Sequence, residues 1–350
     1  MRSNQPPVPG HHRSGLAGAA VVGCALVVAA CGSGSSAGTS PGSSAAGTSS
    51  GTSSAAADVA SGPARATKKT IVFSPLALNI PALKGLSEGL KQYGGGKGYE
   101  ILIQDPKYDP NSQVQQLQSV VDSGRVGGAW VIPVKTGALS DLVRTARGKG
   151  VALLLDGPPA EFGVTGPQPG VSFSVIDYQA EGTAVGKSLG ECITAKQGGT
   201  ADVIFAQAGP GTGGKQEVEQ AAVDALKAAA PGATVVTQLV ATDRSAAQTA
   251  IGTALQAHPK AAVMSSNDEG ALGALGAFAA QGRTGACITD AGGNDEVLAA
   301  VKSGKIYASA ALQFEADMVQ SFDQLTKMMN DLSTPGVQLT VPMKVFTAGS

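Results

Sequence analysis

Short apolar segments alternate with amphipathic segments from Lys69 onward, and this order restricts the fold more than any other feature of the sequence. In the first block, strands are expected at residues 70–73, 99–104, 129–133 and 151–156, and helices at 83–93, 112–122 and 137–149. The glycines at 94–96 are expected to end the first helix. Strands and helices of these lengths favour parallel βαβ units, in which a helix connects each strand to the next.

A second block repeats this order after residues 157–170, which are rich in Pro and Gly and are expected to form neither a strand nor a helix. Its expected helices span 179–193, 216–230, 246–257 and 271–281, and its expected strands span 201–207, 234–240, 261–265 and 286–289. The sequence therefore predicts an α/β protein with two parallel sheets in tandem. In such folds the binding groups follow the carboxyl ends of the strands and face a cleft.

The first 31 residues have the pattern of an export signal. A basic start that includes Arg2 and Arg13 precedes an apolar run at 16–30. This run is shorter than the roughly 20 residues that a membrane-spanning helix needs. It leads through Ala30 into Cys31 and Gly32, which resembles the lipobox of bacterial lipoproteins and makes Cys31 the expected lipidation site. An ordinary signal peptide with an incidental cysteine is the alternative interpretation.

Residues 32–68 consist almost entirely of Gly, Ser, Ala and Thr. Such a segment buries too little apolar surface to offset its ordering entropy, so a disordered tether is expected. The folded body is then expected at 69–346, held at the outer face of the cell membrane by the lipid on Cys31.

Composition argues against catalysis and against a nucleic-acid partner. The net charge of -1 gives no basic field, and after the signal segment the only histidine is His258. Carboxylates such as Asp105, Asp109, Asp156 and Asp290 follow expected strands, but spacing alone cannot pair them. We therefore expect no enzyme activity, no metal and no cofactor.

Two cysteines, Cys192 and Cys287, remain in the body, and they lack the spacing of a metal or redox motif. In an oxidising compartment they are candidates for one disulfide, with two separate buried thiols as the alternative.

A glycine-rich segment at 209–216 resembles a phosphate-binding loop but departs from it at the last position. That position needs a Ser or Thr hydroxyl for the magnesium of a nucleotide, and Gln216 stands there. A glycine-rich turn beside the cleft is the interpretation that we prefer.

Asp156 and Asn267 each lie at or just after the carboxyl end of an expected strand. Carboxylate and amide groups suit the hydrogen bonding of ligand hydroxyls. A turn or cap before Gly157 is the structural alternative for Asp156, and an N-cap of the next helix is the alternative for Asn267.

The body resembles the ribose-type periplasmic binding proteins, whose lobes share the core of the LacI-like repressors. The resemblance lies in the segment Asn267 to Ala274, and in residues 98–99, 105, 109–110, 257–259, 281–283 and 302–306 at the spacing of that family. It implies a type I binding-protein fold, in which two doubly wound lobes are joined by a hinge of three segments. The implied lobes are about 69–175 with 313–343, and about 176–312 with 344–350.

The same resemblance implies that Asp156 and Asn267 hold a ligand, but most of the other sugar contacts of that family are replaced. Ala82 and Leu83 stand where sugar binders carry aromatic rings, and Ile80 stands where an amide is usual. Arginines of the family correspond to Gly157 and Gln216, an aspartate to Gly292, and a glutamine to Leu312. We expect these positions to line the site without the usual sugar chemistry.

The sequence thus predicts a monomeric, lipid-anchored receptor that passes a small sugar or sugar-like ligand to the permease of an ABC importer. The alternatives are a receptor that signals to a membrane protein without transport, and an envelope protein whose cleft has lost ligand binding. No helix-turn-helix segment precedes the body, and the signal peptide excludes a repressor.

Overall fold

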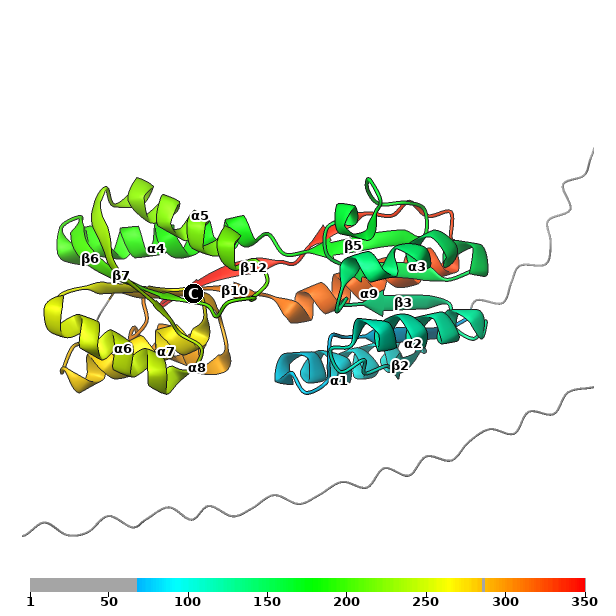
Figure 1. The fold of residues 1–350 in the computed structure, drawn as a ribbon, viewed down its shortest axis with the longest axis horizontal. Helices are drawn as coiled ribbons and strands as arrows, with labels where there is room; N and C mark the ends of the chain where they lie inside the picture. Colours follow the sequence, from blue (N-terminus) through cyan, green and yellow to red (C-terminus); the bar gives the residue numbers. More distant parts are fainter. Residues whose placement is uncertain (1–67, 285–286, 350) are drawn as a thin grey trace, which may run out of the picture. The chain divides into compact units, whose positions relative to one another are not determined.

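The computed structural model describes residues 68–284 and 287–349. Cys31 and the expected tether lie outside the described residues, apart from Lys68. Within the described part of the chain the strands form two six-stranded sheets (Figure 1). No helix in that part is both long enough and apolar enough to cross a membrane.

The first sheet has the strand order β11-β5-β4-β3-β1-β2, and every neighbouring pair in it is parallel. We call this sheet and its helices lobe 1. Its elements are β1 (Thr70–Ser74), α1 (Pro81–Gly96), β2 (Glu100–Ile103), α2 (Pro110–Asp122), β3 (Gly128–Val131), α3 (Ser140–Thr145), β4 (Ala152–Asp156), β5 (Val171–Val175), α9 (Phe314–Asn330) and β11 (Gln338–Thr340), with 3-10 turns at Thr136–Leu139, Arg147–Lys149 and Pro159–Phe162.

The second sheet has the order β12-β10-β9-β8-β6-β7, in which β12 alone runs antiparallel to its neighbour. We call it and its helices lobe 2. Its elements are α4 (Tyr178–Gln197), β6 (Thr200–Gln207), α5 (Lys215–Ala229), β7 (Gly232–Val240), α6 (Arg244–Ala257), β8 (Ala262–Ser265), α7 (Asp268–Ala280), β9 (Ile288–Gly292), α8 (Asp295–Lys302), β10 (Ala308–Leu312) and β12 (Met343–Thr347).

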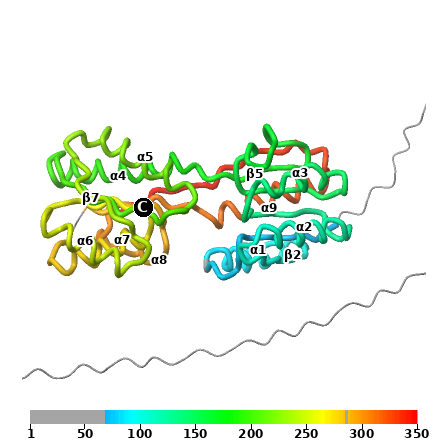
Figure 2. The backbone as a smooth tube through the Cα atoms, in the orientation of Figure 1, coloured from blue at the N-terminus to red at the C-terminus, as the bar shows by residue number. Residues whose placement is uncertain are grey.

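The chain passes between the two sheets three times: from β5 to α4, from β10 to α9, and from β11 to β12 (Figure 2). Hydrogen bonds tie these passages together, from Val341 N to Val175 O (2.8 Å) and from Gln313 N to Pro342 O (2.7 Å). The predicted fold class, two parallel-sheet α/β lobes joined by three segments, is confirmed.

The expectation that glycines 94–96 end the first helix is wrong, because α1 continues through Gly96. A Cβ on Gly94 would lie 2.7 Å from the side chain of Ile101 and 3.1 Å from the ring of Phe322. The missing side chain therefore allows α1 to pack closely, and the helix ends only before Gly98, which has a φ of +80°.

The segments 137–149 and 157–170 also differ from expectation. The first is not one helix but the short helix α3 between two 3-10 turns. The second contains a 3-10 turn at Pro159–Phe162, and the ring of Phe162 is fully buried, 5.6 Å from the ring of Phe173. One apolar anchor thus orders a segment whose average composition predicts an irregular loop.

In lobe 2 the helices α4 and α5 pack through glycines. A Cβ on Gly182 would lie 2.1 Å from Val218 O, and one on Gly186 would lie 2.0 Å from Ala222 O. Gly190 makes a similar approach to Ala229. A disulfide joins Cys192 of α4 to Cys287, directly before β9, with a Cα–Cα distance of 5.7 Å.

Candidate functional site

Asp156 ends β4 at the carboxyl edge of the lobe 1 sheet, where its side chain is half-buried. Its Oδ1 accepts a hydrogen bond from Nε1 of Trp130 (2.9 Å). Burial raises the pKa of Asp156 to about 8, the charge of Asp317 adds to this shift, and the Trp130 hydrogen bond opposes it. Asp156 is therefore mostly protonated at neutral pH and can donate as well as accept a hydrogen bond.

Asp317 lies in the first turn of α9 and was not identified from the sequence. Its Oδ1 accepts hydrogen bonds from Ser174 Oγ (3.0 Å) and Gln320 Nε2 (2.8 Å). Burial raises its pKa, although these hydrogen bonds oppose the shift. The chain itself thus satisfies this buried acid. In the sequence, the only signal for Asp317 is its position shortly after the passage from β10 to α9, where the chain crosses between the sheets.

The apolar positions Ile80, Ala82 and Leu83 lie at the start of α1, after β1. Ile80 is the N-cap residue, Ala82 is exposed, and Leu83 is half-buried. Ala82 and Leu83 line an apolar groove of about 540 Å³ between α1 and α9, together with residues such as Phe314. No polar anchor is contributed by these three side chains.

Gly157 follows Asp156 with a φ of +131°, a conformation that residues with side chains rarely adopt. A Cβ at this position would lie 3.3 Å from the ring of Phe162. Its amide donates to Ser174 O (2.8 Å). An arginine at position 157 therefore does not fit this backbone conformation. The loop after β4 differs locally from the loop of a family member with arginine at that position.

Asn267 lies between β8 and α7 in lobe 2, and it serves as the N-cap of α7. Its Oδ1 accepts from Gly270 N (2.7 Å), and its Nδ2 donates to Ala241 O (2.9 Å). The capping alternative is therefore observed. One lone pair and one N–H of the amide remain for a ligand.

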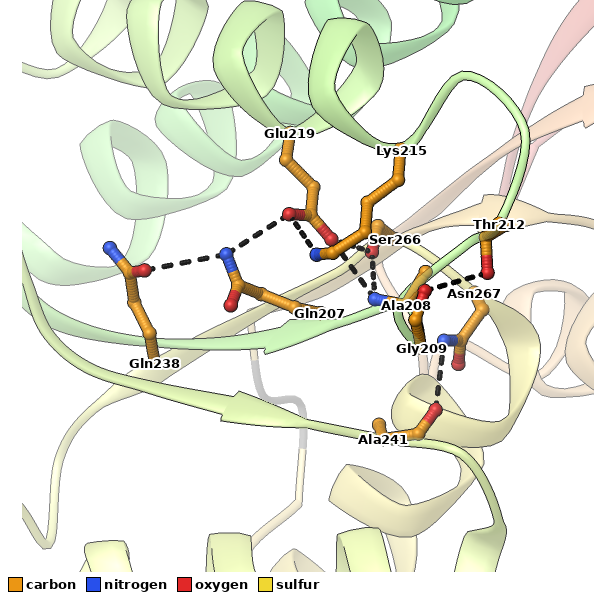
Figure 3. Close-up of polar contacts among 10 residues, drawn as sticks. All are labelled: Gln207, Ala208, Gly209, Thr212, Lys215, Glu219, Gln238, Ala241, Ser266 and Asn267. Atoms are coloured by element: carbon orange, nitrogen blue, oxygen red, sulfur yellow. Dashed lines mark hydrogen bonds and ion pairs between the residues drawn. The ribbon is translucent and has the colours of Figure 1, made fainter.

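The glycine-rich loop before α5 is organised by Glu219 (Figure 3). This buried carboxylate accepts from Ala208 N (3.0 Å) and Ser266 Oγ (2.9 Å), and it pairs with Lys215. In a phosphate-binding loop that lysine would face the phosphates. Here it is committed to Glu219, and Gln216 is exposed, so the geometry does not favour nucleotide binding.

Gly292 and Leu312 end β9 and β10, and both are half-buried. A Cβ on Gly292 would lie 2.4 Å from Oδ1 of Asp268. The Asp268 carboxylate therefore occupies the space beside Gly292. Its Oδ1 accepts from Gly293 N (2.8 Å) and Asn294 N (3.1 Å).

Lobe 2 also contains two buried acids near Asp268. Glu181 lies in the first turn of α4, and Asp290 lies within β9. Burial raises the pKa of Glu181 to about 7, helped by the charge of Asp268. It raises that of Asp290 well above its usual value, with Asp268 again contributing. The sequence places Asp290 near a strand end, but only the fold brings Glu181 beside it.

The structure therefore divides the predicted residues into two groups. Ile80, Ala82, Leu83, Asp156 and Gly157 lie at the carboxyl edge of the lobe 1 sheet, and Gln216, Asn267, Gly292 and Leu312 lie at that of lobe 2. Within the described ranges, no group of three or more His, Cys, Asp or Glu side chains is arranged to hold a metal.

A family profile described as periplasmic binding protein domain matches residues 71–331. The chain belongs to this family. The ribose import binding protein of Bacillus subtilis is 29% identical over 251 residues, which cover 70% of this chain and 77% of the relative. The xylitol-binding protein of Mycolicibacterium smegmatis is 28% identical over 221 residues, covering 62% of this chain and 60% of that protein.

Solved structures agree with this assignment at the level of the fold. A periplasmic ribose ABC transporter structure from Conexibacter woesei matches with a TM-score of 0.64 and 22% identity, covering 82% of this chain and 95% of that chain. A solute-binding protein from Actinobacillus succinogenes with bound D-allose matches with a TM-score of 0.66 and 18% identity, covering 81% and 98%. The resemblance to ribose-type, type I binding proteins is thus confirmed.

Proposed function

We propose that this chain is an extracytoplasmic receptor that captures a sugar or sugar-like ligand and delivers it to the permease of an ABC importer. The observation that carries this proposal is the set of polar groups at the carboxyl edges of both sheets, in a chain with three passages between the sheets. The printed functions of the relatives, ribose import and xylitol binding, support the ligand class. These relatives are binding proteins, which supports a function without catalysis.

In the proposed mechanism, a ligand contacts Asp156 of lobe 1 and Asn267 of lobe 2 at once. A ligand that bridges both lobes binds the closed form better than the open form and therefore shifts the population towards closure. The permease would then distinguish the closed, liganded receptor from the free one. The three connecting segments are the parts that must bend during this change.

The proposed anchoring to the membrane depends on Cys31. With Cys31→Ser the precursor should stay uncleaved or be secreted, and the protein should no longer sediment with membranes. Fractionation of cells followed by immunoblotting measures this. Unchanged membrane association in the variant would contradict lipidation at Cys31.

The proposed ligand is not a simple monosaccharide, because several positions to which the family resemblance assigns sugar contacts are apolar here or lack a side chain. A buried hydroxyl without a partner costs about 1–3 kcal/mol, so the loss of several partners removes tight binding. Isothermal titration with ribose, galactose and similar free sugars should show weak binding or none. Micromolar affinity for any of them would refute this interpretation of the substituted site.

For a ligand found by a thermal-shift screen, Asp156→Ala and Asn267→Ala should each weaken binding by about tenfold or more. Because Asn267 also caps α7, Asn267→Ser is the matched control: it keeps a capping oxygen and loses the amide donor. Unchanged affinity in both alanine variants would place the ligand elsewhere.

A further inference from the structure

The apolar groove of about 540 Å³ between α1 and α9 lies wholly in lobe 1. Its apolar side chains are those of Ala82, Leu83, Leu86, Tyr93, Phe314 and Met318. Gly85 and Gly89 of α1 also line it, and a Cβ on Gly85 would have no atom within 4 Å. Part of the open space therefore exists because α1 carries glycines where side chains could fill the groove.

Phe314 is the most exposed apolar side chain of this groove. It begins α9, directly after the passage from β10, and it is 50% exposed. It belongs to neither of the core clusters of lobe 1, which contain the other phenylalanines of that lobe. Covering an exposed aromatic ring beside an apolar groove is favourable, so this surface indicates that an apolar partner binds here.

The groove begins beside the polar anchor proposed for the ligand. Phe314 and Met318 lie four residues apart at the start of α9, and Asp317 lies between them in the sequence. Asp317 is near enough to Asp156 for its charge to raise the pKa of Asp156. The other wall of the groove starts in the first turn of α1, which follows β1 at the carboxyl edge of the same sheet. A ligand held by Asp156 could therefore extend into the groove.

The charge and size of the groove restrict its occupant. Among the described residues that line it, Glu315 alone is charged. The carboxylate of a fatty acid or the phosphate of a lipid would thus meet no cation in this lining. Aromatic rings and methionine sulfur both favour contact with a ring, and Phe314 and Met318 supply one of each. The volume is within the range of about 300–1,000 Å³ that is usual for small-molecule sites.

We infer that this groove is a subsite for an aromatic group, and that the ligand is an aryl glycoside whose sugar contacts Asp156 and whose ring lies against Phe314. The inference rests on the proposed function, because it extends the ligand of the same site. It also explains the apolar side chains of Ala82 and Leu83, which then border the ring of the ligand and not the hydroxyls of a free sugar.

The ring subsite is tested first without any sugar. In saturation-transfer NMR of the purified full-length chain, the ring protons of benzyl alcohol should receive saturation, with a dissociation constant on the order of 1 mM. The absence of transfer to benzyl alcohol would overturn the inference and would leave the proposed receptor function standing.

Variants locate this binding in the groove. Gly85→Leu places a side chain in the open space and should weaken benzyl alcohol binding about tenfold, and Phe314→Ala should weaken it similarly. Gly95→Leu is the matched control, because it lies on the same helix, also has open space at its Cβ, and does not line the groove. It should leave the binding unchanged, and circular dichroism verifies that all three variants fold. Equal binding by wild type and Gly85→Leu would overturn the inference.

The second measurement joins the ring to a sugar. Isothermal titration compares phenyl with methyl β-D-glucoside, phenyl with methyl β-D-galactoside, and phenyl with methyl β-D-xyloside. In at least one pair the phenyl member should bind about tenfold tighter or better. Gly85→Leu should remove this preference, whereas Asp156→Ala should weaken the phenyl glycoside and leave benzyl alcohol binding unchanged.

The two measurements separate failure of the inference from failure of the proposed function. If methyl and phenyl members bind equally well, the inference is overturned and the receptor function stands. If benzyl alcohol binds in the groove but no glycoside binds, the ring subsite stands and the sugar part of the ligand, which comes from the proposed function, is overturned. Analytical ultracentrifugation tests a second copy as the occupant: a dimer that Gly85→Leu dissociates would overturn the ligand assignment.

Discussion

The two lobes have related sheet orders but fill their cores differently. Among the described residues seven aromatic rings are fully buried. Five of them lie in lobe 1, namely Phe73, Trp130, Phe162, Phe173 and Phe322, and two lie in lobe 2, namely Phe205 and Phe278. Lobe 2 instead packs α4 on α5 through glycines and adds a disulfide. A chain with few aromatics can therefore build one core from rings and another from close backbone contact.

Their polar edges differ as well. In lobe 1 the acids Asp156 and Asp317 have hydrogen-bond partners within the chain. In lobe 2 the buried Asp290 lies beside Asp268 and Ser309, and burial together with the charge of Asp268 raises its pKa. The acids of lobe 1 are thus held by uncharged donors, whereas the buried Asp290 of lobe 2 faces another carboxyl group, which favours its protonated form.

The disulfide should produce the largest effect and should separate the lobes. The double variant Cys192→Ser/Cys287→Ser should lower the unfolding free energy of lobe 2 by about 4–5 kcal/mol in the chain-entropy account. Trp130 is the only tryptophan and lies in lobe 1, so its fluorescence reports that lobe, whereas circular dichroism reports both. Urea unfolding should shift the dichroism and leave most of the fluorescence transition in place.

Equal shifts of the dichroism and fluorescence transitions would show that the lobes unfold as one unit and would contradict a separate stability of lobe 2. As a check on the bond itself, Cys192 and Cys287 should resist alkylation in the denatured, unreduced protein.

The glycine contact in lobe 2 should give the next largest effect. Gly186→Ala places a Cβ 2.0 Å from Ala222 O, where backbone must move, and should cost about 3 kcal/mol. Gly252→Ala is the matched control on α6, where a Cβ has open space, and should stabilise by about 0.5–1 kcal/mol. Urea unfolding monitored by circular dichroism measures both. Similar values for the two variants would contradict packing through glycine.

The pH response of Asp156 is the most local of these effects and is specific to lobe 1. Its pKa is about 8 in the folded protein, above the ordinary carboxyl value. Its stabilising contribution is therefore complete below that ordinary value and is lost as the pH rises through about 8. Trp130 fluorescence should titrate near pH 8 through the hydrogen bond to Asp156, and Asp156→Asn should abolish that titration. A titration that persists in the variant would exclude Asp156 as its cause.

Much of the secondary structure follows from local pattern. The strands at β3, β4 and β8 and the helices at α2 and α6 lie within a few residues of their expected positions, because apolar periodicity and capping residues act over short distances. The errors at residues 94–96 and 159–162 have a common cause. In both, a contact with a distant ring, Phe322 or Phe173, outweighs the local preference.

By itself, the sequence determined that this chain forms two parallel α/β lobes and that Asp156 and Asn267 follow strands, since such features depend on neighbours along the chain. Only the tertiary structure decided how each polar group is used. In the folded chain Lys215 pairs with Glu219, Asn267 caps α7, and Glu181 lies beside Asp268 and Asp290. These contacts join residues from separate elements, and the energy of a buried charge depends on every group around it, which no local pattern records.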